Sequence, residues 1–198
     1  MDADATPGAD RRRGRARKGP RRMNEARLER IAVAHLERFG SSVANLRMVL
    51  RRRIAKSCDH HDDDPARFDA PLEELLVRLE RMGLLDDRRY GESVVRIGRG
   101  RGQSGRAIRA KLRQKGLDPA LCDELLGGGD SDADTDPEFE AAWRYARRRR
   151  IGPFRLDPEL RREQRQRDLA ALGRRGFGYG VAQSVIDGEL EDDDFPRL

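Results

Sequence analysis

The stretch from Leu72 to Leu126 decides the fold: LEELLVRLERMGLLDDRRYGESVVRIGRGRGQSGRAIRAKLRQKGLDPALCDELL. Its apolar residues first recur at i, i+3, i+4 and i+7, namely at Leu72, Leu75, Leu76 and Leu79. That spacing predicts a helix that packs on one face. Gly83 predicts the end of this helix, and Asp86 is the predicted N-cap of the next one.

Two more helices are predicted within the same stretch. Ser104 is the expected N-cap of a helix that ends at Gly116. Asp118-Pro119 then predicts the start of a third helix, because proline at the first helical position loses no hydrogen bond. Residues 84–126 are therefore predicted to form a three-helix unit.

A repeat links this unit to the rest of the chain. Leu112, Lys115 and Gly116 are followed by apolar residues at intervals of four, and the same pattern begins again sixty residues later at Leu172. The helical stripe from Val43 onward follows the same order. We predict an all-α, elongated tandem array of three three-helix repeats, which share apolar surface because each is too small to fold well alone. The expected repeats are residues 24–83 with a loop insertion over 56–70, residues 84–126, and residues 138–187.

Three segments outside the repeats lack apolar periodicity. They are predicted to be a disordered basic N-terminal arm over 1–23, a flexible acidic linker over 127–137 and an acidic tail over 188–198. The arm either binds nucleic acid or only solubilises the protein. No apolar segment follows its arginines and no apolar run reaches membrane length, so we expect a cytoplasmic protein without membrane contact.

The charge of the chain is concentrated in its middle. Hydrophobic residues make up 36% of the 198 residues and charged residues 39%, which favours several thin helical layers over one thick core. The net charge is +6, but the segment from Arg88 to Lys115 alone holds ten basic residues and one acidic residue. A basic segment on a nearly balanced chain indicates an anionic partner, either nucleic acid or an acidic protein surface.

The predicted binding residues come from this segment and from the matching turn of the last repeat. A face that is only solvated normally mixes charges of both signs, and this one does not, although a solvated face remains the alternative. The glycine-rich turn from Gly98 to Gly102 is a poor phosphate loop, because no strand precedes it and the Lys-Ser/Thr pair is missing. The candidate residues are Arg99, Arg101, Arg106, Arg109, Arg113, Lys115, Arg174 and Arg175.

Metal binding and catalysis are both predicted to be absent, and no cofactor is expected. Cys58, His60 and His61 stand beside three aspartates, but a structural zinc site usually needs two separated pairs of ligands, and a real site is the alternative. Asp86-Asp87 fits helix capping better than a catalytic carboxylate pair. His35 lies on an apolar stripe, which favours a partly buried core residue. No nucleophile with a matching base is evident, so we do not expect an enzyme.

A family resemblance rests on three segments. Leu84-Leu85-Asp86-Asp87-x-x-Tyr90, followed by the basic segment and by Ile108 to Leu117, resembles the RecX family of RecA recombinase regulators. The segment from Leu172 to Phe177, with the apolar residues up to Ile186, resembles that family's C-terminal signature. Two positions depart from the family pattern: Gly91 replaces the usual alanine, and Lys111 stands where an acidic residue is common.

The resemblance implies a function. A member of this family is expected to bind the RecA nucleoprotein filament and to modulate it, most often by inhibiting strand exchange, in DNA repair, homologous recombination and the SOS response. The implied partners are the RecA filament and the DNA phosphate backbone, single- or double-stranded, and the protein is expected to be a monomer. The alternative is a stand-alone nucleic-acid-binding helical module without a recombinase target.

Overall fold

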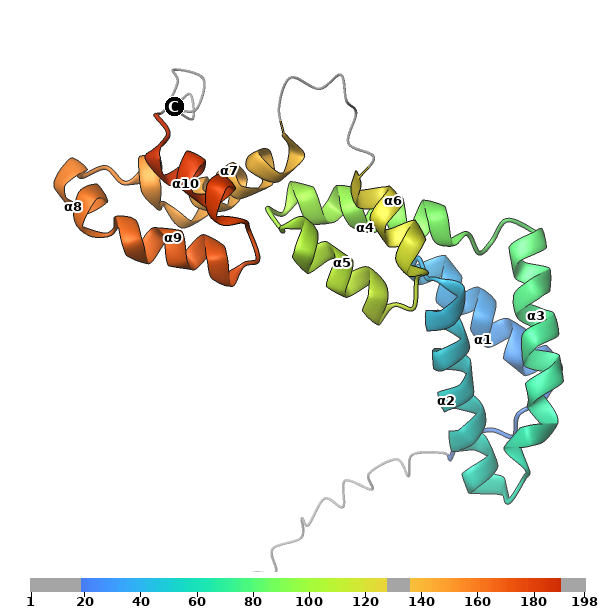
Figure 1. Ribbon diagram of the computed structural model, residues 1–198. Helices are drawn as coiled ribbons and strands as arrows, with labels where there is room; N and C mark the ends of the chain where they lie inside the picture. Colours follow the sequence, from blue (N-terminus) through green and yellow to red (C-terminus); the bar gives the residue numbers. More distant parts are fainter. Residues whose placement is uncertain (1–18, 128–135, 190–198) are drawn as a thin grey trace, which may run out of the picture.

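The computed structural model describes residues 19–127 and 136–189, and within these ranges it contains α-helices and short 3-10 helices but no strand. The helices form three units that follow one another in a curved, elongated row (Figure 1). The predicted all-α array of three helical repeats is confirmed. Each unit has a hydrophobic core of its own.

The first unit contains α1 (Glu25–Arg38), α2 (Val43–His61), the 3-10 helix η1 (Pro65–Phe68) and α3 (Asp69–Arg81). The leucines of the predicted α3 stripe are buried in its core. The expected loop insertion over 56–70 is wrong for most of its length. Because Cys58 continues the buried stripe of α2, that helix runs on to His61, and Phe68 is buried in the core as well.

The N-terminal segment is packed from residue 19 onward, contrary to the prediction of a disordered arm over 1–23. Met23 is buried in the core of the first unit. Arg22 Nε donates to Asp63 Oδ2 over 2.8 Å, and a ring nitrogen of His61 lies 2.8 Å from the Pro20 carbonyl oxygen. These contacts hold the segment against the end of α2. Residues 1–18 lie outside the described residues.

The second unit contains α4 (Asp87–Gly100), α5 (Gly105–Gln114) and α6 (Pro119–Gly127). Both predicted caps are confirmed: Asp86 accepts from the Arg89 amide, and Ser104 accepts from the Ala107 amide. The absence of a side chain at Gly91 lets α4 approach α6, because a Cβ there would collide with the side chain of Leu125. That close approach explains the glycine.

The third unit contains α7 (Pro137–Arg149), the 3-10 helix η2 (Gly152–Phe154), α8 (Pro158–Glu163), α9 (Arg165–Arg174) and α10 (Tyr179–Asp187). It therefore has four α-helices where three were expected, because the chain before Leu172 forms two helices, α8 and α9, that are separated at Gln164. The expected linker over 127–137 and the tail over 188–198 fall mostly outside the described residues.

The two joints between units use the same contacts. At the first joint, Ser42 Oγ donates to the Lys115 carbonyl oxygen, and Asp87 Oδ1 accepts from the Val43 amide over 2.8 Å. Ser42 is also the N-cap of α2, so one hydroxyl both caps a helix and binds the next unit. The joints therefore use polar backbone groups at helix ends, which need a hydrogen-bond partner in any case because they have none within the helix.

At the second joint, Ser104 Oγ donates to the Arg175 carbonyl oxygen over 2.7 Å, and Glu138 Oε2 accepts from the Gly105 amide over 2.9 Å. Ser104 caps α5 as Ser42 caps α2. The repeat in the sequence is therefore also a repeat of the contact between units.

Replacing Ser104 with alanine is expected to lower the free energy of unfolding by about 1–2 kcal/mol, since the cap is lost and the Arg175 carbonyl loses its partner. Urea unfolding followed by circular dichroism measures the loss. The matched control is Ser184→Ala on the exposed surface of α10, which should change stability by less than about 0.5 kcal/mol. Equal values for the two variants would contradict the joint's contribution.

Candidate binding surface

The joints place end to end the second helices of the first two units, α2 and α5, and α9, which holds the equivalent place in the repeat of the third unit. The C-terminal end of α9 meets the N-terminus of α5, and the C-terminal end of α5 meets the N-terminus of α2. Figure 1 shows α9, α5 and α2 following one another along one side of the curved row. Basic side chains on these three helices can therefore form one continuous edge, which we call the second-helix edge.

The middle of this edge is the outer face of α5. Arg106, Arg109 and Arg113 are spaced i, i+3 and i+7, so they share one face of the helix. Arg106 and Arg113 are exposed and take part in no ion pair in the described part of the chain. Arg109 Nε lies 2.8 Å from Asp123 Oδ1, but the two side chains are 42% and 64% exposed, so solvent screens this pair and it holds the arginine only weakly.

The second joint brings the basic residues of two units together. The Arg106 side chain lies against the turn at Gly176, where a built Cβ would be 3.4 Å from the Arg106 Cβ. Arg174 and Arg175 belong to the same turn and are exposed. The Arg175 guanidinium also lies over the Tyr145 ring, 5.2 Å from its centroid, in a cation–π contact that fixes its direction.

Three of the predicted binding residues lie in the joints. Arg99 forms an ion pair with Glu138, and its side chain is only 17% exposed. The Arg101 carbonyl oxygen accepts from Arg148 Nη2 over 2.7 Å, while the Arg101 side chain is exposed. Lys115 Nζ donates to Asn45 Oδ1 over 3.1 Å. The charge that the edge offers to a partner is therefore smaller than the sequence suggests.

The outer face of α2 extends the edge and was not among the predicted binding residues. A hollow there is lined by Arg47, Arg51, Arg52 and the exposed Met48. Arg47 is held by Glu73, which accepts from Nε and Nη2 over 2.8 Å each; this hydrogen bonding raises the pKa of Arg47 and lowers that of Glu73. The signal was present in the sequence, because Arg47 and Arg51 occupy the helix positions that Arg109 and Arg113 hold in α5.

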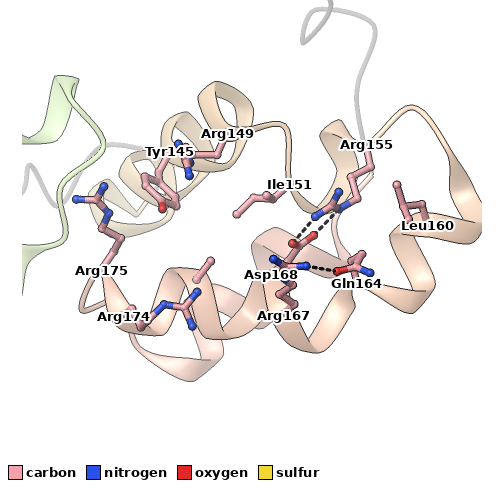
Figure 2. Close-up of a pocket in the computed structure, with 11 residues that line it drawn as sticks. Tyr145, Arg149, Ile151, Arg155, Leu160, Gln164, Arg167, Asp168, Arg174 and Arg175 are labelled. Atoms are coloured by element: carbon pink, nitrogen blue, oxygen red, sulfur yellow. Dashed lines mark hydrogen bonds and ion pairs between the residues drawn. The ribbon is translucent and has the colours of Figure 1, made fainter.

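A cavity of about 800 Å³ opens beside α9 in the third unit (Figure 2). Ile151, Tyr145 and Ala171 form its apolar part, and several arginines project around it. Arg155 is bound by Asp168, whereas Arg174 and Arg175 lie at the end of the cavity next to α5. The lining arginines are Arg149, Arg155, Arg167, Arg174 and Arg175.

The residues weighed as metal ligands are engaged in other contacts. Cys58 is buried, and burial raises the pKa of its thiol. Asp63 is bound by Arg22, which lowers the pKa of the carboxyl group. Within residues 19–127 and 136–189, no three His, Cys, Asp or Glu side chains are placed to hold a metal ion. That the protein carries no metal stays a prediction.

The remaining candidates have structural positions. Asp86 caps α4, as predicted, while Asp87 accepts from α2 across the first joint. His35 is partly buried and its ring lies 5.5 Å from the ring of Phe39, centroid to centroid. Among the described helices, none is long and apolar enough to span a bilayer.

Comparisons with known proteins give one consistent result. Residues 86–126 match the family described as "RecX, second three-helix domain". The chain is 39% identical over 185 residues to "Regulatory protein RecX" of Myxococcus xanthus, covering 93% of this chain and 97% of that protein. It is 31% identical over 176 residues to the protein of the same name from Thermobifida fusca, with 86% and 85% covered.

A solved structure shows the same fold. It is described as "Crystal structure of regulatory protein RecX" and superposes with a TM-score of 0.57 at 24% identity, covering 83% of this chain and 73% of that chain. At this identity the likeness concerns the arrangement of helices alone. The tandem array is therefore a known arrangement.

Proposed function

The chain belongs to the RecX family of regulatory proteins, and on that premise we propose that it binds the RecA nucleoprotein filament and restrains RecA activity in DNA repair and recombination. The observation that carries the proposal is the second-helix edge, where exposed arginines of two units meet at one joint. An edge of this length suits a partner that is itself a repeating array. The proposal includes a monomeric, cytoplasmic protein that acts by binding and not as an enzyme.

The mechanism follows from the shape and the charge of the row. A curved, elongated protein can lie along a helical filament and contact several subunits at once. Exposed arginines such as Arg106, Arg113 and Arg174 supply attraction and steering toward the DNA phosphates, and apolar and polar contacts with the subunits supply specificity. A protein bound in this way opposes rearrangement of the subunits along which strand exchange proceeds.

Charge reversal at Arg106, Arg113 and Arg174 tests the proposal. If roughly 3–5 phosphates are contacted, log affinity for bare DNA falls against log salt concentration with a slope of about −2 to −5, and the triple glutamate variant should lose two to three units of that slope. Affinity for the RecA filament should fall about 10- to 100-fold. Fluorescence anisotropy at several salt concentrations and RecA ATPase inhibition are the measurements.

Arg99 stays unchanged in this variant, because its ion pair with Glu138 belongs to the joint. The control changes the same charge elsewhere, with glutamate at Arg30, Arg81 and Arg162, all exposed and without an ion pair in the described ranges. A folded test variant that inhibits the filament like the wild type would refute the role of the edge. Equal wild-type affinity for bare and RecA-coated DNA would favour the stand-alone nucleic-acid-binding module.

A further inference from the structure

The first unit contains a second basic cavity, of about 900 Å³, which lies between α1 and α2 and is bordered by residues 19–23. We call it the α1–α2 groove. Among the described residues no carboxylate lines it, and none of its cationic side chains takes part in an ion pair in residues 19–127 and 136–189. Such a concentration of unpaired positive charge attracts an anionic ligand. The cations are Arg21, Arg27, Arg38, Arg53 and Lys56.

Among the described residues, two buried nitrogen atoms of side chains that line this groove have no hydrogen-bond partner: Arg27 Nε and His35 Nε2. Leaving a buried donor unpaired is unfavourable, so a ligand that offers acceptors along the groove is favoured. The two residues are eight positions apart on α1, which corresponds to about 12 Å along the helix axis. The ligand is therefore extended along the groove and is larger than a single small ion.

The electrostatics of His35 agree with the positive charge of the groove. Burial lowers the pKa of its imidazole, and the charges of Lys115 and Arg53 lower it further. A neutral imidazole keeps one N–H, which in the Nε2 tautomer can be donated to an anion. An anion in the groove opposes the two cations and so should raise the pKa of His35.

The groove also offers an aromatic surface. The Phe39 side chain is 60% exposed beside His35, and Ile31 and Val49 line the cavity between α1 and α2. A ligand that fits both features carries several anionic groups and a planar apolar group. A single nucleic-acid strand has this combination, because its phosphates pair with cations while an unstacked base stacks on an aromatic ring.

We propose that the α1–α2 groove binds a segment of single-stranded nucleic acid, with phosphates on Arg38, Arg53 and Lys56 and one base on Phe39. The inference rests on the proposed function and extends it, because it gives single-stranded nucleic acid a binding site separate from the second-helix edge. An unstacked base is required, so single strands bind here in preference to duplex. An acidic peptide supplies the charge but offers Phe39 no stacked base.

The test uses the full-length protein and a short oligothymidine, without RecA. Arg53→Glu with Lys56→Glu should weaken binding at least 10-fold more than the charge-matched control Arg30→Glu with Arg81→Glu, whose residues lie outside the groove. Phe39→Ala should weaken binding of the single strand about 5- to 50-fold, in line with the loss of one stacked base, and leave duplex binding unchanged. Because RecA is absent, a failure of the filament proposal does not affect this outcome.

A second readout follows the ligand at the site itself. Nuclear magnetic resonance titration of the His35 imidazole should show its pKa rising when oligothymidine is added to the wild type, and not in the Arg53→Glu, Lys56→Glu variant. Equal effects of both double variants on binding, together with an unchanged His35 pKa, would overturn the proposal. An oligoaspartate that raises the pKa as much as oligothymidine, with Phe39→Ala without effect, would replace it with an acidic-peptide site.

Discussion

Replacing Asp168 with alanine is expected to lower the free energy of unfolding of the third unit by about 3–5 kcal/mol. Its side chain is only 2% exposed. Its two oxygens accept from Arg155 Nη2 at 2.7 Å and Nε at 2.8 Å, and from the Gly152 amide at 3.0 Å. Alanine would leave a mostly buried guanidinium without its counterion and the Gly152 N–H without an acceptor, and breaking one side of a buried pair is far more harmful than losing an exposed one.

Trp143 is the only tryptophan of the chain and belongs to the third unit, so its fluorescence reports this transition during urea unfolding. Asp187→Ala is the control, because the Asp187–Arg165 pair is partly exposed and should contribute less than about 1 kcal/mol. A loss below 1 kcal/mol for Asp168→Ala would show that the pair does not hold the unit together.

The sequence repeat indicates which substitutions at the same site should restore the stability lost in Asp168→Ala. Asp168 occupies the helix position that Leu46 holds in α2 and Ile108 holds in α5, both fully buried. Asp168→Leu combined with Arg155→Met should therefore recover most of the lost stability, because apolar residues of similar volume replace buried ion pairs with little loss or with a gain. The double variant therefore separates the contribution of the ion pair to stability from the contribution of side-chain packing at this position.

Local signals allowed much of the fold to be predicted. The caps at Asp86 and Ser104 and the leucine stripe of α3 depend on residues within one or two turns of each other, so the sequence displays them directly. The segment over 56–70 was mispredicted because its run of polar and acidic residues hides the widely spaced buried positions Cys58 and Phe68. Tertiary packing there overrides weak local preference.

The candidate binding residues stay a prediction, and the structure supplies their neighbours, which the sequence could not show. Arg106, Arg174 and Arg175 come from two repeats, and the joint places the Arg106 side chain against the turn that holds Arg174 and Arg175. The partner of Arg99 could not be predicted, because Glu138 lies far along the chain and meets it only through the joint. The α1–α2 groove was missed for the same reason, since its lining runs from residue 19 to residue 57.

Gly102→Ala is expected to lower stability by about 2–4 kcal/mol through two separate effects. The φ angle of Gly102 is +63°, where an L side chain is strained. A Cβ there would also lie 2.8 Å from the Ala141 carbonyl oxygen and 3.0 Å from the Tyr145 nitrogen, both backbone atoms of α7 that can move only if the whole helix moves. The variant therefore pushes the second and third units apart.

Gly83→Ala isolates the first effect. Gly83 has a φ angle of +69°, but a Cβ there meets no atom of the described residues within 4 Å, so only the strain of about 1–2 kcal/mol is expected. The difference between the two variants in urea unfolding is the contribution of the collision at the joint. Equal losses of unfolding free energy in the two variants would mean that α7 moves away from the added Cβ at little cost in energy.

The same pair of variants connects the joint to binding. Gly102→Ala changes no charge, yet it should separate Arg106 from the turn that carries Arg174 and Arg175. If filament binding depends on the two units presenting their arginines together, Gly102→Ala should weaken it several-fold while Gly83→Ala, equally folded, should not. Small-angle scattering checks that the row has changed its curvature. Unchanged filament affinity in a Gly102→Ala protein of altered curvature would show that each unit binds independently, and the edge would then act as separate patches.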